Sequence, residues 1–332
     1  MGLQVASSSF NTFNGTYASS NTKSAYNITT SAENNTIDCG SSFILNGTNT
    51  TDTYGIYSNS FNTTILNCRM ENYSTGIYFN GATNGTIDNI TAFTSRYGDA
   101  DSNGNGIFLY SSANFNTITN SNFTSNRNGT GIFIYSSSNN NILNSRDTSV
   151  FYPGIYLYAS SNNSIINSTG TSTSSSGICL YSSSNNNQII NSTGTSSSSY
   201  GIYLYVSSNN NITGSTGTST TTTGIYLSSN SNNNQIINST GTSTSASGIY
   251  INAYSNNNQI INSTGTSTSY YGITLSTISN YNQIINSTGV SGTKYGLFIQ
   301  NTISNNITGG FYSSSSTTAG WHSAVNITGS NF

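Results

Sequence analysis

The chain has 332 residues but only six lysine or arginine and eight aspartate or glutamate residues, and its formal net charge is −2 at pH 7. So few basic side chains exclude the electrostatic grip on nucleic acid that clustered lysine and arginine provide. The sequence has no run of about 18 apolar residues, so we expect no membrane span. It also starts without the basic and apolar stretches of a signal peptide.

Residues 1–50 are polar and irregular, and we expect them to form an N-terminal segment with the first coils of a repeat. Cys39 and Cys68 each follow a similar Thr-Ile pair, which would place them on adjacent coils. They form either a disulfide or two buried thiols. The third cysteine, Cys179, stands alone at a position where neighbouring repeats carry tyrosine.

From residue 51 to residue 332 one unit recurs, in its clearest copies every 23 or 24 residues. In one copy Ile155 and Leu157 follow Gly154 with a period of two, and a second apolar anchor, Ile165, follows half a repeat later. A period of two predicts a strand with one buried face, and no segment shows the spacing of a helix. The glycines that open the clearest copies are Gly154, Gly177, Gly201, Gly224, Gly248, Gly272 and Gly296.

A fixed period of this length predicts a solenoid in which each unit is one coil. With at least two strands and no helix in each unit, we predict an all-β parallel β-helix of about 12 coils with an uncapped C-terminal coil. The Ser-Asn-Asn-Asn stretch of each unit is typical of a turn, because asparagine tolerates left-handed backbone geometry.

The repeated stretches G-I-Y-L-Y and S-N-N-N-Q-I-I-N-S-T-G resemble right-handed parallel β-helix repeats, in particular those of the NosD-like and carbohydrate-binding/sugar-hydrolase class. The resemblance covers about residues 50–320 and implies a single-stranded, right-handed coil. Polysaccharide-active members of this fold cluster carboxylates with arginine or lysine on adjacent coils.

Catalytic side chains are scarce in this chain. No charged residue lies between Asp147 and Lys294, and the only histidine is His322. Glycoside hydrolysis needs two neighbouring carboxyl groups, for which Asp88, Asp99 and Asp101 of one coil are the only candidates. We interpret these acids as loop or ion-binding residues, and we predict no catalytic residue and no enzyme.

One insertion resembles a calcium loop. Asp99, Asp101 and Asn103 alternate ahead of Gly104, as oxygen ligands do in the first half of such a loop, but Tyr110 stands where a bidentate glutamate belongs. A weak calcium site and an asparagine- and aspartate-rich surface turn are both compatible with these residues. No other cofactor is expected.

Sequons for N-glycosylation are frequent, and five are in register two residues after the second anchor: Asn167, Asn191, Asn238, Asn262 and Asn286. If the strand stays extended these five point inward as an amide ladder; if the chain turns a corner they point outward. We expect a mixed outcome, with the in-register sites mostly forming a ladder. The glycosylation candidates in irregular and turn segments are Asn14, Asn27, Asn46, Asn62, Asn72, Asn84, Asn128, Asn162 and Asn326.

Aromatic residues alternate with the inward anchors and should stack into an outer face. Such rings either stabilise the strands alone or form a packing or sugar-binding surface. The residues of this face are Phe108, Tyr110, Phe133, Tyr135, Tyr156, Tyr158, Tyr203 and Tyr205.

Taken together, these patterns favour an extracellular or cell-surface structural protein, a glycosylated subunit of a filament, sheath or surface layer. Uncapped coils favour head-to-tail or lateral contacts with copies of itself. The alternative is an adhesin or receptor-binding spike that recognises glycans through the aromatic face. A polysaccharide-active enzyme is the third reading. We expect no nucleic acid partner and no membrane span.

Overall fold

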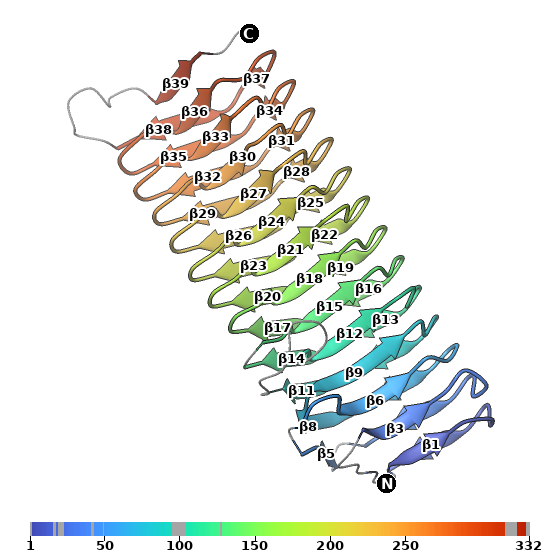
Figure 1. Cartoon of the computed structure of the whole chain (residues 1–332). Coiled ribbons are helices and arrows are strands. Elements are labelled where there is room, and N and C mark those ends of the chain that lie inside the picture. The colour runs from blue at the N-terminus through green and yellow to red at the C-terminus, as the bar shows by residue number, and fades with distance from the viewer. Residues whose placement is uncertain are drawn as a thin grey trace. The chain divides into compact units, whose positions relative to one another are not determined.

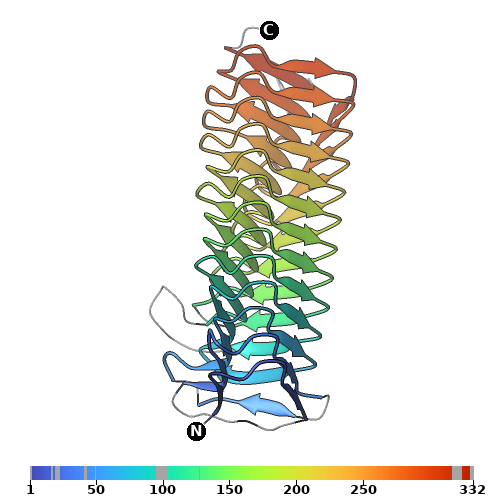
Figure 2. The ribbon, with the colours of Figure 1, turned by 90° about the vertical axis from the view of Figure 1, so that its right-hand side faces the viewer.

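The computed structural model describes residues 2–15, 18, 23–40, 43–48, 50–94, 104–126, 128–315 and 324–329. Every regular element among them is a β-strand, and none of these residues belongs to a helix that could cross a membrane. The chain divides into two compact units, residues 1–170 and 171–332. Each unit is a parallel β-solenoid in which three short strands make one coil (Figures 1 and 2).

We call the sheets A, B and C, after the first, second and third strand of each coil. In the first unit sheet A contains β1 (Leu3–Val5), β3 (Ser24–Ile28), β6 (Tyr54–Ser58), β9 (Thr75–Asn80), β12 (Ile107–Tyr110), β15 (Ile132–Tyr135) and β18 (Ile155–Tyr158). Sheet B contains β2 (Thr12–Asn14), β4 (Thr36–Asp38), β7 (Thr64–Leu66), β10 (Thr86–Asp88), β13 (Thr117–Thr119), β16 (Asn141–Leu143) and β19 (Ser164–Ile166). Sheet C contains β5 (Ile44–Asn46), β8 (Arg69–Tyr73), β11 (Thr91–Thr94), β14 (Asn122–Ser125) and β17 (Arg146–Ser149).

The strand β20 (Thr169–Ser172) contains the sequence boundary between the units. In the second unit sheet A contains β21 (Ile178–Tyr181), β24 (Ile202–Tyr205), β27 (Ile225–Ser228), β30 (Ile249–Ile251), β33 (Ile273–Ser276), β36 (Leu297–Gln300) and β39 (Val325–Thr328). Sheet B contains β22 (Gln188–Ile190), β25 (Asn211–Thr213), β28 (Gln235–Ile237), β31 (Gln259–Ile261), β34 (Gln283–Ile285) and β37 (Asn306–Thr308). Sheet C contains β23 (Thr193–Ser196), β26 (Thr216–Ser219), β29 (Thr240–Ser243), β32 (Thr264–Ser267), β35 (Thr288–Ser291) and β38 (Phe311–Ser314).

The repeat sets the register of every coil on the next. Ile225 pairs with Ile249 in sheet A, and Ile236 pairs with Ile260 in sheet B. These side chains are fully buried, and since strand side chains alternate between the two faces, each anchor stacks on the same residue type in the adjacent coil. The predicted all-β parallel solenoid with a period near 24 residues is therefore confirmed.

The Ser-Asn-Asn-Asn stretch turns the chain between sheets A and B. Asn233 adopts a left-handed backbone with a φ of +57°, which asparagine tolerates. The next residue, Asn234, is fully buried, and its Oδ1 accepts the backbone N–H of Asn210 at 2.8 Å. The backbone N–H of Asn234 in turn donates to Oδ1 of Asn258 at 2.7 Å. This repeated amide satisfies buried turn groups that no strand partner reaches.

The inward column of sheet C differs between the units. In the first unit it carries side chains, among them Met70, Ala92 and Phe123. In the second unit it carries glycine in β23, β26, β29, β32 and β35, and Tyr312 in β38. A Cβ added to Gly241 would contact the carbonyl oxygen of Gly248. The backbones of sheets C and A therefore touch at these glycines, where the column has no room for a larger residue.

Candidate functional site

The outer face of sheet C in the first unit carries charged side chains, which are rare in this chain. In β8 Met70 is buried, so alternation turns its neighbours Arg69 and Glu71 outward. Register places Thr91 beside Arg69 and Phe93 beside Glu71 on β11. Two adjacent coils thus bring a guanidinium, a carboxylate and a phenyl ring together.

These side chains line an open hollow of about 310 Å³ whose walls are Arg69, Glu71, Asn72 and Phe93. Both Nε and Nη2 of Arg69 donate to Oε1 of Glu71, at 3.0 and 2.7 Å. The guanidinium carbon also lies 5.8 Å from the centre of the Phe93 ring. The side chain of Glu71 is 30% exposed and that of Arg69 is 53% exposed, so solvent and ligands reach both.

Asn72 closes one side of the hollow. Its backbone has a φ of +58°, and its Nδ2 donates to Oδ1 of Asn46 on β5 at 2.8 Å. Asn46 and Asn72 are also two of the glycosylation candidates. A glycan on Asn72 would fill the hollow that its side chain lines.

The arrangement supplies three chemical functions. A carboxylate accepts a proton or a hydroxyl hydrogen bond, a guanidinium binds an anion or a developing negative charge, and a partly exposed ring offers a flat apolar surface. None of these three residues was among the sequence candidates. The available signal was the Arg-x-Glu spacing itself, since a pair two residues apart in a strand shares a face.

Asp147 lies on the same sheet but faces the interior. It is 0% exposed, and neither carboxyl oxygen has a hydrogen-bond partner among the described residues. Burial raises the pKa of the Asp147 carboxyl well above its usual range. Because no substrate reaches this group, it belongs to the core and not to the hollow.

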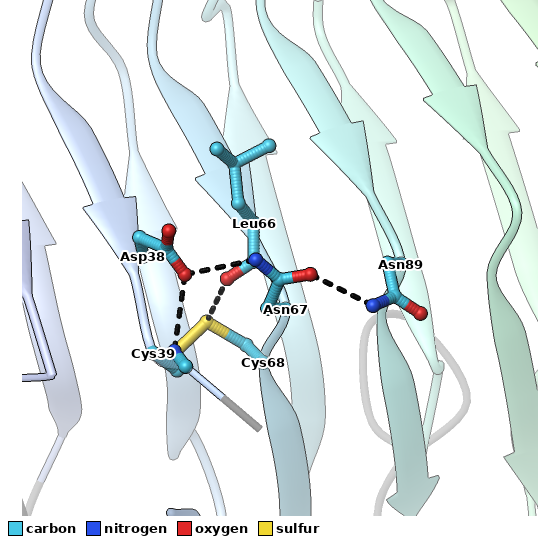
Figure 3. The surroundings of a disulfide bond; sticks show 7 residues. Asp38, Cys39, Leu66, Asn67, Cys68 and Asn89 are labelled. Atoms are coloured by element: carbon cyan, nitrogen blue, oxygen red, sulfur yellow. Dashed lines mark hydrogen bonds between the residues drawn. A yellow bond between two sulfur atoms is a disulfide. The ribbon is translucent and has the colours of Figure 1, made fainter. Parts of the chain in front are cut away.

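Figure 3 shows that Cys39 and Cys68 form a disulfide, with their Cα atoms 4.9 Å apart. Both residues are buried at the end of sheet B, where Asn67 donates from Nδ2 to Oδ1 of Asp38 at 3.0 Å. Asn89 donates to Oδ1 of Asn67 in the same way at 2.7 Å. Cys179 is a free, buried thiol.

The calcium candidates Asp99, Asp101 and Asn103 lie outside the described residues, as does His322. The part of the chain that the structure describes contains no group of three or more histidine, cysteine, aspartate or glutamate residues placed to hold a metal ion. Calcium binding by the insertion stays a prediction.

The in-register asparagines turn a corner and point outward. Asn191 and Asn238 have φ of +49° and +48° and exposed side chains, so the alternative of an extended strand with an inward ladder is wrong for them. The buried ladder is built from the last asparagine of each Ser-Asn-Asn-Asn turn instead. Among the other candidates, Asn14, Asn46, Asn84 and Asn162 are exposed, while Asn27, Asn62, Asn72, Asn128 and Asn326 are partly exposed. Glycosylation of any of them stays a prediction.

The predicted aromatic residues stack on the outer side of sheet A. In the first unit the Phe133 ring lies 5.0 Å from those of Phe108 and Tyr156, and Tyr135 lies 5.0 Å from Tyr158. Phe108 is only 2% exposed, so its ring serves packing. In the second unit Tyr203 stacks on Tyr226 and Tyr205 on Tyr181. Binding of a partner by these rings stays a prediction.

Comparison with known proteins identifies the fold. Residues 54–205 match the family model described as "Right handed beta helix region". Among solved structures, the periplasmic alginate epimerase AlgG superposes with a TM-score of 0.58 at 13% identity, over 92% of this chain and 76% of that one. The catalytic domain of a GH87 alpha-1,3-glucanase superposes with a TM-score of 0.53 at 15% identity, over 100% of this chain and 65% of the glucanase chain.

A mannuronan C-5 epimerase A-module from Azotobacter vinelandii superposes with a TM-score of 0.45 at 13% identity, over 94% of this chain and 79% of that one. No curated protein sequence matches this chain. The matches correct our expectation of a non-enzymatic, self-assembling structural protein, and with it the adhesin alternative, because AlgG and the glucanase are carbohydrate-active enzymes. At such low identity the superpositions establish the fold. The chain folds as a parallel β-solenoid, and its residues 54–205 match the right-handed β-helix model.

Proposed function

We propose that this chain is a carbohydrate-active enzyme that acts on a polysaccharide at the hollow lined by Arg69, Glu71, Asn72 and Phe93. The observation that carries the proposal is the meeting of a carboxylate, a guanidinium and an exposed ring on two adjacent coils. The chain has few charged residues. Among the described residues, this surface brings a carboxylate, a cation and an apolar ring together in reach of solvent.

Each group has a role in this proposal. Phe93 is 37% exposed and stacks against the apolar face of a sugar ring. The Glu71 carboxylate accepts a proton from the bound sugar or from water. Arg69 orients that carboxylate through two N–H donors and offers its remaining donors to the substrate.

The reaction class follows from the number of carboxylates. Glycoside hydrolysis uses two carboxyl groups on either side of the scissile bond, and Glu71 is the one carboxylate among the described residues that line the hollow. A single base beside a guanidinium suits abstraction of a proton from the carbon next to a sugar carboxylate, the chemistry of an epimerase or a lyase. A lyase completes this step by expelling the glycosidic oxygen, which takes a proton from water, and an epimerase completes it by taking a proton from water on the opposite face of the ring. AlgG, with the same fold, is an epimerase by name.

We further propose that the protein works outside the cytoplasm. A disulfide between two buried cysteines, Cys39 and Cys68, is typical of oxidising compartments. The name of AlgG likewise gives its location as periplasmic.

The test is turnover of a panel of neutral and acidic polysaccharides by the whole chain and by Glu71→Gln. Glutamine keeps an acceptor for Arg69 but is no base, so we expect the rate to fall by at least about 100-fold. Glu33→Gln removes an exposed carboxylate far from the hollow in the sequence and serves as the matched control. Activity of Glu71→Gln within threefold of the control, a limit of about 0.7 kcal/mol, would refute the assignment of the base.

Two further variants test the reaction class. Asp99→Asn and Asp101→Asn remove the carboxylates of the segment that directly follows β11 and lies outside the described residues. We expect both to keep the turnover of the unaltered chain. A loss as large as that of Glu71→Gln would mean that the reaction uses a second carboxylate, and would overturn the single-base class.

A further inference from the structure

We propose that the substrate is an acidic polysaccharide that lies across the strands of sheet C, with Arg146 binding an acidic group some three coils away from Arg69. This inference rests on the proposed function, because it extends the same hollow along the same face. Arg146 is assigned as a positioning residue that holds the chain and takes no part in proton transfer.

The outward positions of sheet C in the first unit form two rows. The backbone register runs Arg69, Thr91, Asn122 and Arg146 in the first row. The second row runs Glu71, Phe93, Thr124 and Thr148 in the same coils. Since neighbouring strands lie about 4.8 Å apart, the Cα atoms of Arg69 and Arg146 are separated by roughly 14 Å across three strand spacings.

The charge of this face is unbalanced in favour of cations. Arg146 is exposed and forms no ion pair with any residue that the structure describes. Its sequence neighbour Asp147 is turned into the core by strand alternation, and its carboxyl has a raised pKa there. Arg69 shares its charge with Glu71, and the other outward side chains of the two rows are neutral. The face therefore carries its net positive charge at Arg146, while at Arg69 an acidic group binds the N–H donors that Glu71 leaves open.

Between the two arginines the face offers hydrogen-bonding groups at every coil. Thr91 and Asn122 continue the first row, and Thr124 and Thr148 continue the second. A pyranose unit in an extended glycan advances by roughly one strand spacing, so a chain lying across the strands meets one coil per sugar. Hydroxyl groups then bind threonine and asparagine, while acidic groups bind the guanidinium forks of the arginines.

A single acidic sugar is too short to reach both arginines, and a neutral glycan gains nothing from either charge. The distance between the two arginines and the positive charge of the face together favour a polymer with repeated acidic groups. Carboxylate and sulfate groups share the required chemistry, and the choice of probe distinguishes them.

The test is equilibrium binding, by titration calorimetry, of a soluble polyuronate, of its carboxyl-reduced neutral counterpart and of a sulfated neutral glycan. Each is titrated into the whole chain, into Arg146→Gln and into Lys294→Gln. The last variant removes one positive charge from the second unit and serves as the control. We expect Arg146→Gln to weaken polyuronate binding by about fivefold, the effect of losing one exposed ion pair, and to lower its salt dependence. Lys294→Gln should do neither.

Equal affinity for the polyuronate and its neutral counterpart, or equal effects of the two variants, would overturn the inference. Tighter binding of the sulfated glycan than of the polyuronate would change the acidic group from carboxylate to sulfate and overturn the epimerase or lyase reading. Binding of polyuronate that depends on Arg146, without turnover of any glycan, would support the inference while the proposed enzymatic function fails.

Discussion

Replacing Asp147 by asparagine should stabilise the protein at neutral pH and remove part of its pH dependence. Asp147 is fully buried in β17, and both of its carboxyl oxygens lack a hydrogen-bond partner among the described residues. A buried polar group without a partner costs about 1–3 kcal/mol, and a buried negative charge costs more. The folded protein avoids the larger cost by keeping the carboxyl protonated, which is why burial raises its pKa.

The sign of the effect follows from the two protonation states. In the unfolded chain the Asp147 carboxyl loses its proton at about pH 4, whereas in the folded protein it keeps the proton to a higher pH. Between these two pKa values the unfolded chain binds fewer protons, so the free energy of unfolding falls as pH rises. The loss is about 1.4 kcal/mol for each pH unit within that window, and it ends above the folded pKa.

Urea unfolding of the unaltered chain and of Asp147→Asn, followed by circular dichroism from about pH 4 to about pH 8, measures the difference. Other carboxyl groups contribute equally to both proteins and cancel. We expect the variant to gain stability over the unaltered chain as pH rises above about 4, until the pH passes the folded pKa of Asp147. Asp88→Asn is the control, because Oδ1 of Asp88 is partly exposed and accepts from Thr119 Oγ1 at 2.6 Å. A difference between the chain and Asp147→Asn that stays constant with pH would refute the reasoning.

Three further substitutions test the packing. Replacing Cys39 and Cys68 by serine opens a loop whose ends are 29 residues apart and should lower the free energy of urea unfolding by about 3.5 kcal/mol. Cys179→Ala is the control, because it removes a free thiol and keeps the disulfide. Gly241→Ala should destabilise by about 1–3 kcal/mol, because the added methyl meets the backbone of the adjoining sheet; an unchanged melting temperature would contradict that contact. Asn234→Ala leaves the buried backbone N–H of Asn210 without its acceptor and should lower the free energy of unfolding by about 1–3 kcal/mol. Gln235→Ala, at an exposed residue, should cause no measurable loss.

Much of the fold could be predicted from the sequence because one residue type fills each position of the coil. Ile236 and Ile260 are one repeat apart in the sequence, and they pair directly with each other in sheet B. The corner after that strand was harder to predict, because Asn238 is compatible with both an extended and a left-handed backbone. The structure gives it a φ of +48°, and its side chain faces solvent.

The hollow could not be found from periodicity, since it depends on departures from the repeat. Arg69, Glu71 and Phe93 occupy positions that hold threonine in later coils, and only the register of β8 on β11 brings them together. Two neighbouring carboxylates are the sequence pattern for hydrolysis, and one carboxylate paired with a cation does not fit that pattern. The expectation of a non-enzymatic protein is corrected by the structural matches to AlgG and the glucanase.

The glycine column of the second unit allows such a chain to change length by whole coils. Gly217, Gly241 and Gly265 pair in one continuous register, and each coil there contacts its neighbours through almost the same set of residues. Removing residues 225–248 would join Gly224 to Ile249 and leave Ile202 facing an isoleucine, as it faces Ile225 now. Whole coils can therefore be lost or duplicated by recombination between near-identical gene segments without a new interface, whereas a gain or loss of a few residues would disturb every strand of the coil.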